Sequence, residues 1–512
     1  MAQVSSISSN ATGLKIAEET TPGVLPGSPI FLTLEPNTYA DFGAQIGTTP
    51  RAPINPSRQR KKGVTTSLSA SGGFNTDLTQ ANLQDIFQGF FYADLRTKDE
   101  LSVTTTTGAS ETYNVAAGGT GFADGDLLFA KDFAVASSNG LKTVASSTAT
   151  TVVIDENIED DTTGTISKVG ATTLAGDIDV LAAGGGALPT LTSTTFDFTT
   201  LGLIPGEFIF IGGDTSGAAG DQFLTAANNG FKRVRSVTAN VLTIDKSDST
   251  MVTEANTAEF VKIFIGRALK NESDPTLQVT RTYTLERTLG APDDASLSDV
   301  QADGLQGAYA NEIALNLPAE DKVTLDLGYV GLDGLTVTGP TALPSASGTV
   351  VAVSEASAFN TTSDFSRIKL ATAGSTDEAP TALFAFVEEI TLNINNNVTP
   401  NAALSVLGAA VVSVGTFEVG GQLTAFFQDT VGTTAVRNNT NLTLDFALVK
   451  ENAGMVFDIP LITLGDGRPT VEIDTPIKLP LSSEAATGAL IDSTLDHTLF
   501  VVFFDYLPTA AE

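Results

Sequence analysis

The sequence predicts a mainly β protein with one α-helix and two small β modules in tandem. Short runs in which apolar and polar residues alternate recur along most of the chain, as expected for half-buried strands. The 47 glycines and the many Ser and Thr residues supply turns between such strands. Apolar residues recur at convincing helical spacing in one stretch, residues 77–92.

Length and charge limit the class of protein. A chain of 512 residues is too long for one compact core, so roughly two to four domains are expected. The 27 Lys and Arg face 59 Asp and Glu, a net charge of -32, which disfavours ordinary binding to DNA or to an anionic membrane. The absence of Cys excludes disulfides and thiolate metal sites. Neither a secretory signal nor a bilayer-spanning run is expected.

Residues 1–62 form the first predicted segment, an extended arm rich in Pro, Gly and Thr. The end of this arm holds five of the 27 basic residues in twelve positions and no acid. These residues are Arg51, Arg58, Arg60, Lys61 and Lys62. On so acidic a chain, docking on the acidic surface of a neighbouring subunit is the preferred interpretation, and a nucleic-acid patch is the alternative.

Residues 63–100 are predicted to hold a strand followed by the helix. Thr76 or Asp77 can cap this helix, which would run to about Tyr92. The candidate core residues of the helix recur at helical spacing and are Leu83, Ile86, Phe87 and Phe90. We interpret this aromatic stripe as core rather than as a binding site.

Residues 101–185 and 186–266 carry an internal repeat. Residues 125–129 match residues 206–210, and residues 139–146 match residues 229–236. The match continues to Asp155 and Asp245, which lie 90 positions apart. A strand, an Asn-Gly turn and a second strand are typical of a β-hairpin. The repeat therefore predicts two small β modules that interrupt the surrounding domain.

Residues 276–288 predict a long strand with one apolar and one polar face. Residues 312–317 and 323–330 alternate in the same way and are joined by a short polar turn, which favours a hairpin. Together they predict an antiparallel sheet with one dry and one wet face. Arg281 falls on the dry face, where it needs a carboxylate partner, expected at a subunit boundary.

The remaining sequence offers little chemistry. His497, the only histidine, lies among Ser, Thr and Asp residues and is interpreted as a surface residue without a catalytic triad. Residues 155–161 contain five acids, for which a solvated turn is preferred over a calcium site. We therefore predict no catalytic residue, no metal site, no cofactor and no enzyme activity.

The chain resembles tail tube proteins of long-tailed bacteriophages of the siphovirus type. The resemblance rests on the arm with Glu18 to Gly23, the basic segment and the helix. It resumes in the alternating strands at residues 276–288, 389–397, 416–427 and 442–449. It covers about half of the chain in two blocks, and the repeat modules lie between them like a decoration inserted in a loop.

The resemblance implies a β-sandwich or half-barrel subunit that closes with five further copies into a homohexameric ring. Rings would stack head to tail around an acidic channel for genome delivery, with the tape-measure, tail terminator and distal tail proteins as partners. DNA would pass without specific binding, no membrane would be involved, and the subunit would assemble in the host cytoplasm into the virion tail. The candidate channel-facing residues are Thr280, Thr282, Thr284 and Glu286.

The implied domain division places three segments of a tube domain around the insertions. In chain order it comprises an arm (1–62), the first tube segment (63–100), two modules (101–185 and 186–266), the second tube segment (267–335), a Gly/Pro/Ser-rich loop or small β insertion (336–380) and the third tube segment (381–512). Two other functions stay open at this point. One is an extracellular, S-layer-like adhesin, and the other is a tail-spike polysaccharide depolymerase.

Overall fold

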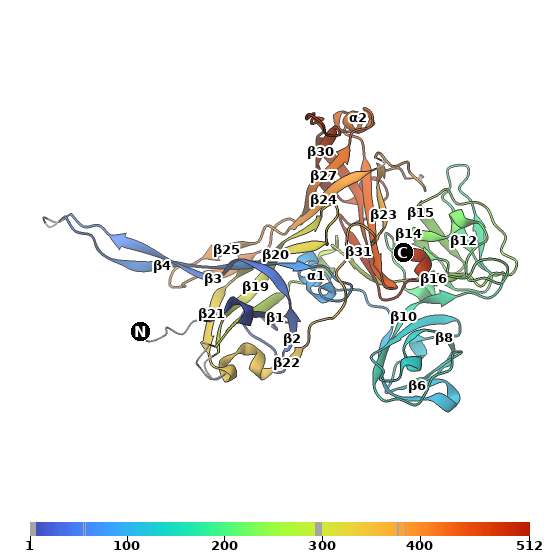
Figure 1. Cartoon of the computed structure of the whole chain (residues 1–512), viewed down its shortest axis with the longest axis horizontal. Helices are drawn as coiled ribbons and strands as arrows, with labels where there is room; N and C mark the ends of the chain where they lie inside the picture. Colours follow the sequence, from blue (N-terminus) through green and yellow to red (C-terminus); the bar gives the residue numbers. More distant parts are fainter. Residues whose placement is uncertain (1–6, 55, 57, 292–299, 376–377, 385) are drawn as a thin grey trace. The chain divides into compact units, whose positions relative to one another are not determined.

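A computed structural model describes residues 7–54, 56, 58–291, 300–375, 378–384 and 386–512. The chain divides into two compact units, each built from three segments. Unit 1 comprises Met1–Ala93, Thr276–Thr361 and Glu388–Thr424, and unit 2 comprises Asp94–Pro275, Thr362–Val387 and Ala425–Glu512. Both are mainly β, and the predicted fold class is confirmed (Figure 1).

Within the described residues, unit 1 is a mainly antiparallel β structure with one α-helix, and only β2 and β22 pair in parallel. Its first elements are β1 (Gly13–Glu18), β2 (Ile30–Leu34), β3 (Pro36–Arg51), β4 (Lys61–Asp77) and α1 (Gln84–Phe91). They are followed by β18 (Thr282–Gly290), β19 (Gln301–Leu317), β20 (Thr324–Gly331), β21 (Asp333–Thr338), β22 (Thr349–Val351), β24 (Val387–Asn395), β25 (Thr399–Ala402), β26 (Ala409–Ser413) and β27 (Glu418–Phe426).

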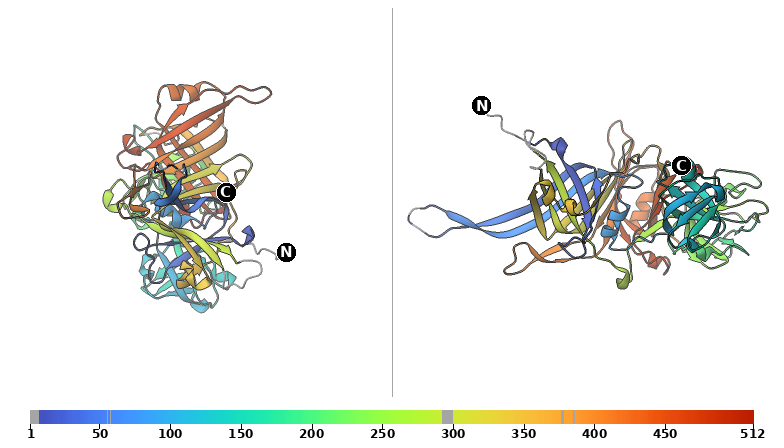
Figure 2. Two further views of the ribbon diagram at one scale, coloured as in Figure 1. Left: turned by 90° about the vertical axis from the view of Figure 1, so that its left-hand side faces the viewer. Right: turned by 90° about the horizontal axis from the view of Figure 1, so that it is seen from below.

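The long strand β19 organises unit 1 because each of its halves pairs on both edges. Its first half pairs with β18 and β21, and its second half pairs with β20 and β24. β20 in turn pairs with β4, and β4 pairs with β3. β3 and β4 continue together beyond this sheet as a long hairpin (Figures 1 and 2).

Two predicted elements of unit 1 are shorter than expected. The predicted strand 276–288 begins only at Thr282, because Pro275–Leu277 forms a 3-10 turn. The predicted helix begins at Gln84 rather than at Asp77. Asn82 donates to the carbonyl of Asp77 over 2.9 Å, and this bond holds the intervening residues in a turn.

Unit 2 contains the two repeat modules, and the first of them is a closed β-barrel. Barrel 1 consists of β5 (Glu100–Thr107), β6 (Thr112–Val115), β7 (Asp126–Lys131), β8 (Gly140–Ser147), β9 (Thr151–Ile154) and β10 (Gly164–Thr172). These six strands pair in a closed circle, so the barrel leaves no free edge.

The second module, which we call barrel 2, consists of β11 (Asp179–Leu181), β12 (Thr190–Thr192), β13 (Phe208–Ile211), β14 (Gly230–Val237), β15 (Val241–Ser247) and β16 (Lys262–Phe264). Its strands pair in the same order as those of barrel 1, but among the described residues β16 pairs with β10 and not with β11, so the circle is not closed. One turn shows the repeat at atomic detail. Asn139 accepts a bond from the amide of Phe133 and donates to its carbonyl, and Asn229 makes the same two bonds with Phe223. The following glycines, Gly140 and Gly230, both have φ near +92°.

In the part of the chain that the structure describes, six strands and the helix α2 complete unit 2, and we call this set of elements the frame. It consists of β17 (Arg267–Lys270), β23 (Phe365–Thr372), α2 (Val431–Arg437), β28 (Leu442–Lys450), β29 (Ala453–Asp466), β30 (Lys478–Ala486) and β31 (Phe500–Phe504). Phe208 and Phe231 of barrel 2 share a buried cluster with Phe500 and Phe504 of β31. Barrel 2 therefore shares part of the core of unit 2, and barrel 1 contributes Leu127 and Val169 to the same cluster.

Candidate functional site

The sheet with one dry and one wet face is present, but β18 is not its wet strand. Four strands form it in the order β4, β20, β19 and β24. Phe74, Leu327, Ile313 and Ile394 are buried on the dry face. There Tyr329 of β20 meets Phe90 of α1, with ring centroids 5.4 Å apart.

The opposite side of this sheet is open and polar, and we call it the open face. It is built from cross-strand rows, because residues paired in register point to the same side. The rows are Asp77–Thr324–Asn316–Thr391, Asn75–Asp326–Ala314–Asn393 and Gly73–Gly328–Glu312–Asn395. Its acids are Asp77, Glu312, Asp326 and, farther along β24, Glu389.

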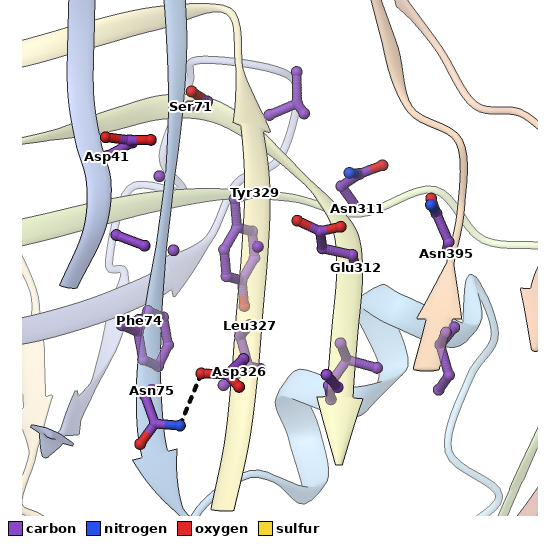
Figure 3. A pocket seen from close by; sticks show the side chains of 18 of the residues that line it. Asp41, Ser71, Phe74, Asn75, Asn311, Glu312, Asp326, Leu327, Tyr329 and Asn395 are labelled. Carbon is purple, nitrogen blue, oxygen red and sulfur yellow. Dashed lines mark hydrogen bonds between the residues drawn. The ribbon is translucent and has the colours of Figure 1, made fainter. Parts of the chain in front are cut away.

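Hydrogen bonds hold the polar groups of the open face in place. Asp326 accepts a bond from Asn75 over 2.8 Å (Figure 3). It accepts a second bond, also over 2.8 Å, from Asn316. Lys322 reaches Asp77 over 2.7 Å, and both side chains are partly exposed. Four acids against this one lysine leave the face negative.

A groove of about 630 Å³ lies along the open face. Figure 3 shows Glu312, Asn311 and Asn395 along one side of it and Asp41 and Ser71 along the other. Gly328 keeps it open, since a Cβ there would come within 2.7 Å of the Glu312 side chain. Its lining combines carboxylates, amides and hydroxyls with apolar residues such as Phe74, Val330 and Ile394, and among the described residues it holds no basic side chain.

The predicted channel-facing residues of β18 lie elsewhere. Thr280, before the strand, is exposed, whereas Thr282, Thr284 and Glu286 are buried within the subunit. Thr284 donates to Glu19 over 2.6 Å, and Glu286 accepts bonds from Lys15 and from both the amide and the hydroxyl of Ser345. The expected wet face at these three positions is therefore wrong for the subunit, because all three are buried and partners within the subunit satisfy the side chains of Thr284 and Glu286. The channel-facing assignment itself stays a prediction.

Arg281 finds its partners within its own unit. Its guanidinium donates to the carbonyl of Ala93 over 3.0 Å and lies 3.4 Å from a carboxylate oxygen of Glu18. The expected partner at a subunit boundary is not needed to explain this residue. The Glu18 side chain is more than half exposed, so the ion pair contributes little beyond the hydrogen bond.

The predicted docking residues surround the tip of the β3–β4 hairpin. Arg51, Arg58, Arg60, Lys61 and Lys62 are all exposed. The apolar side chains of Ile46, Ile54 and Val64 are exposed on the same hairpin. An arm of this length with exposed charged and apolar groups suits contact with another protein surface. The predicted core residues Leu83, Ile86, Phe87 and Phe90, by contrast, are buried.

Sequence reasoning missed a buried ionic network that connects barrel 2 to the frame. Arg233 contacts Asp245 of its own barrel and Asp458 of β29, at 2.9 and 2.8 Å. Lys246 contacts Asp458 and Asp445, each at 2.8 Å. Burial alone would raise the pKa of Asp458, but Arg233 and Lys246 lower it below its usual value.

One signal in the sequence could have revealed this network. Arg233, Arg235 and Lys246 occupy positions that hold Thr143, Ala145 and Glu156 in the first repeat. Their partners Asp445 and Asp458 interrupt strongly apolar runs. Buried charges are rare unless they are paired, so unmatched cations in one repeat and isolated acids in apolar strands predict partners.

His497 is fully buried, which corrects its interpretation as a surface residue. Its ring packs edge-on against Phe500, and Nε2 lies 4.0 Å from Asp458. Burial lowers the pKa of His497 despite the opposing effect of Asp458. The imidazole therefore sits neutral in the core beside the ionic network.

Acids at residues 155–161 accept hydrogen bonds from backbone amides. Glu156 accepts from the amide of Thr143, Asp160 from that of Gly108, and Asp161 from that of Val135. The bond from Val135 lowers the pKa of Asp161. Across the described residues of the chain, no three acids or histidines are arranged to hold a metal ion.

The comparison with protein families decides what kind of protein this is. The sequence matches the phage tail tube protein family over residues 9–261 and 167–485. The chain belongs to the phage tail tube protein family. No curated protein matches it. The chain is accordingly a structural tail tube protein and a component of the virion tail. Within the described residues, no helix is long and apolar enough to cross a bilayer.

Proposed function

We propose that copies of this tail tube protein close into rings that stack head to tail around an acidic channel for the phage genome. The observation that carries the proposal is the open face. A polar sheet with a dry back is suited to line a water-filled pore when it is repeated around a closed ring, because closure removes its free edges. The resemblance to phage tail tubes implies homohexameric rings, which means six positions around the channel.

The charge of the open face fits passage of DNA. Glu312, Asp326 and Glu389 project from three neighbouring strands. A wall of this sign repels phosphates, so the duplex moves without adhering to it. We place the channel wall on this face instead of on Thr282, Thr284 and Glu286, and Thr280 remains a candidate beside it.

The basic hairpin tip gives the subunit a means of contacting its neighbours. Arg58, Arg60 and Lys61 lie at this tip, and each neighbouring copy of the chain has a net charge of -32. Attraction between the tip and the acidic surface of an adjacent copy would guide stacking. The resemblance further implies contacts with the tape-measure, terminator and distal tail proteins at the axis and the ends of the tube, and assembly in the host cytoplasm.

Electron microscopy of the purified protein tests the proposal. Negative stain should show rings or tubes with a central hole as the concentration rises, and persistent monomers at high concentration would contradict it. A single cysteine then locates the channel wall, since the chain has none of its own. The Asn393→Cys variant on the open face should react with a bulky maleimide before assembly and lose this reactivity in tubes.

The matched control carries Thr150→Cys at an exposed turn of barrel 1. This variant should react equally in both states. A small maleimide should label both variants in tubes, which shows that the thiols remain intact. Full reactivity of the Asn393→Cys variant toward the bulky reagent in tubes would move the channel wall to another face.

A further inference from the structure

The frame of unit 2 repeats the strand pairing of unit 1. In unit 1, α1 precedes β18, which pairs with β1 and β19, and β19 pairs with β20 and β21. In unit 2, α2 precedes β28, which pairs with β23 and β29, and β29 pairs with β30 and β31. The order along the chain is the same. One chain thus contains two tube-like folds.

The long strands β19 and β29 differ in one strand pairing. The second half of β19 pairs on one edge with β20 and on the other with β24, from Glu312 with Asn395 to Leu317 with Ile390. The second half of β29 pairs with β30, whereas β28 stops at Ile462. Among the described residues, Thr463 to Asp466 therefore have one edge without a strand.

The strand that fits this free edge is β3. β24 leads into the hairpin before α2, and β3 leads into the hairpin before α1. β3 pairs with β4 on one edge, and the described residues provide no strand for the other. None of its 16 residues is buried. A long exposed edge strand is a template for pairing with another chain.

We propose that β3 of one chain pairs antiparallel with the second half of β29 of the next chain, so that a ring of six positions contains three chains instead of six. Within a chain, β24 takes the place in the second fold that β3 takes in the first, and it already pairs with β19 of the first fold. If β3 pairs with β29 of the neighbouring chain in the way that β24 pairs with β19, the first fold of one chain is joined to the second fold of its neighbour. Such a head-to-tail contact generates a ring when its rotation closes, as the proposed ring requires.

This inference rests on the proposed ring, and its test separates the two. Single cysteines are placed at exposed positions on each strand, Gln45→Cys on β3 and Thr463→Cys or Asp466→Cys on β29. Mixing one β3 variant with one β29 variant should give disulfide dimers in tubes, and these dimers can only join different chains. Thr150→Cys in place of the β29 cysteine is the matched control and should give none.

The variant with both cysteines should give an oxidised ladder on denaturing gels that ends at three chains of 52.9 kDa each. End views of the tubes should show threefold symmetry. A ladder that ends at six chains, or sixfold symmetry, would overturn the inference and leave the proposed ring standing. Threefold rings without dimers in the mixed sample would overturn the β3–β29 contact. Absence of rings would instead remove the proposed function itself.

Discussion

Barrels 1 and 2 are built alike but relate differently to the rest of unit 2. Both use the same asparagine turn, and in both an acid at the start of the third strand accepts a backbone amide, Asp126 from Ala123 and Glu207 from Ile204. Both modules contribute to the apolar cluster around β31, barrel 1 through Leu127 and Val169 and barrel 2 through Phe208 and Phe231. Among the described residues, only barrel 2 adds buried cations that pair with acids of the frame. The two repeats therefore share the residues that make the fold and differ in this ionic contact.

The largest expected effect comes from removing both barrels. Deleting residues 101–264 leaves Asp445 and Asp458 without Lys246 and Arg233, and it uncovers Phe500 and Phe504. Uncompensated buried charge and exposed aromatic surface both oppose folding. We expect insoluble protein, measured by expression and gel filtration. A soluble deletion variant that still forms tubes would show that the barrels are decoration after all.

A single substitution sharpens the comparison. Arg233→Ala should lower the free energy of unfolding of unit 2 by about 3–5 kcal/mol, because Asp458 and Asp245 lose a buried partner. The matched change in barrel 1 is Thr143→Ala, which should stay within about 0.5 kcal/mol. Urea unfolding followed by circular dichroism measures both. Equal effects would mean that the network does not hold barrel 2 in place.

The shared turn predicts equal effects. Asn139→Ala and Asn229→Ala each remove a side chain that bonds both the amide and the carbonyl of a phenylalanine. Each should destabilise its barrel by about 1–3 kcal/mol. Hydrogen exchange of the amides in each barrel measures the two separately. A large difference between the two variants would break the structural equivalence of the repeats.

The smallest effect is a pH dependence that arises where barrel 2 meets the frame, at His497. His497 packs against Gly206, where a Cβ would lie 2.4 Å from its ring, and its pKa is lowered by burial. Below about pH 6.5 the unfolded chain binds a proton that the folded chain does not, so stability is complete above this pH and falls as the pH drops.

His497→Gln should flatten the stability curve between pH 7 and 5, measured by thermal unfolding. The chain has one histidine and most carboxylates titrate lower. Burial raises the pKa of Asp126 and Glu207, but both carboxyls are present in the parent and in the variant, so the difference between the two curves reports on His497. Arg233→Ala should retain a histidine-dependent slope. An unchanged slope in the His497→Gln variant would show that the imidazole is not held neutral.

The features that depend on local pattern were predictable from the sequence. Alternation located the β19–β20 hairpin, and matching turns located both barrels. Alternation did not predict the surroundings of β18, because polar residues on a strand can face either solvent or buried polar partners. The partners of Thr284 and Glu286 are Glu19 and Ser345, which lie far away in the sequence. The prediction that His497 is a surface residue failed for the same reason, because its polar neighbours in the sequence do not indicate that it packs against Phe500.

The sequence likewise predicts that a sheet with a wet face exists, but it does not predict which strands form that face. Strand 323–330 was expected to pair with 312–317, yet nothing local indicated that β4 and β24 would flank this hairpin. Asn75, Asp326 and Asn393 come from strands far apart in the sequence. Only the fold brings them into one row.

A cryo-electron microscopy map of the assembled tube tests the placement of the channel wall most directly. We predict rings around a channel whose wall is formed by β4, β20, β19 and β24, with Glu312 and Asp326 facing the lumen. A map in which this sheet faces outward, or lies sealed between subunits, would contradict it.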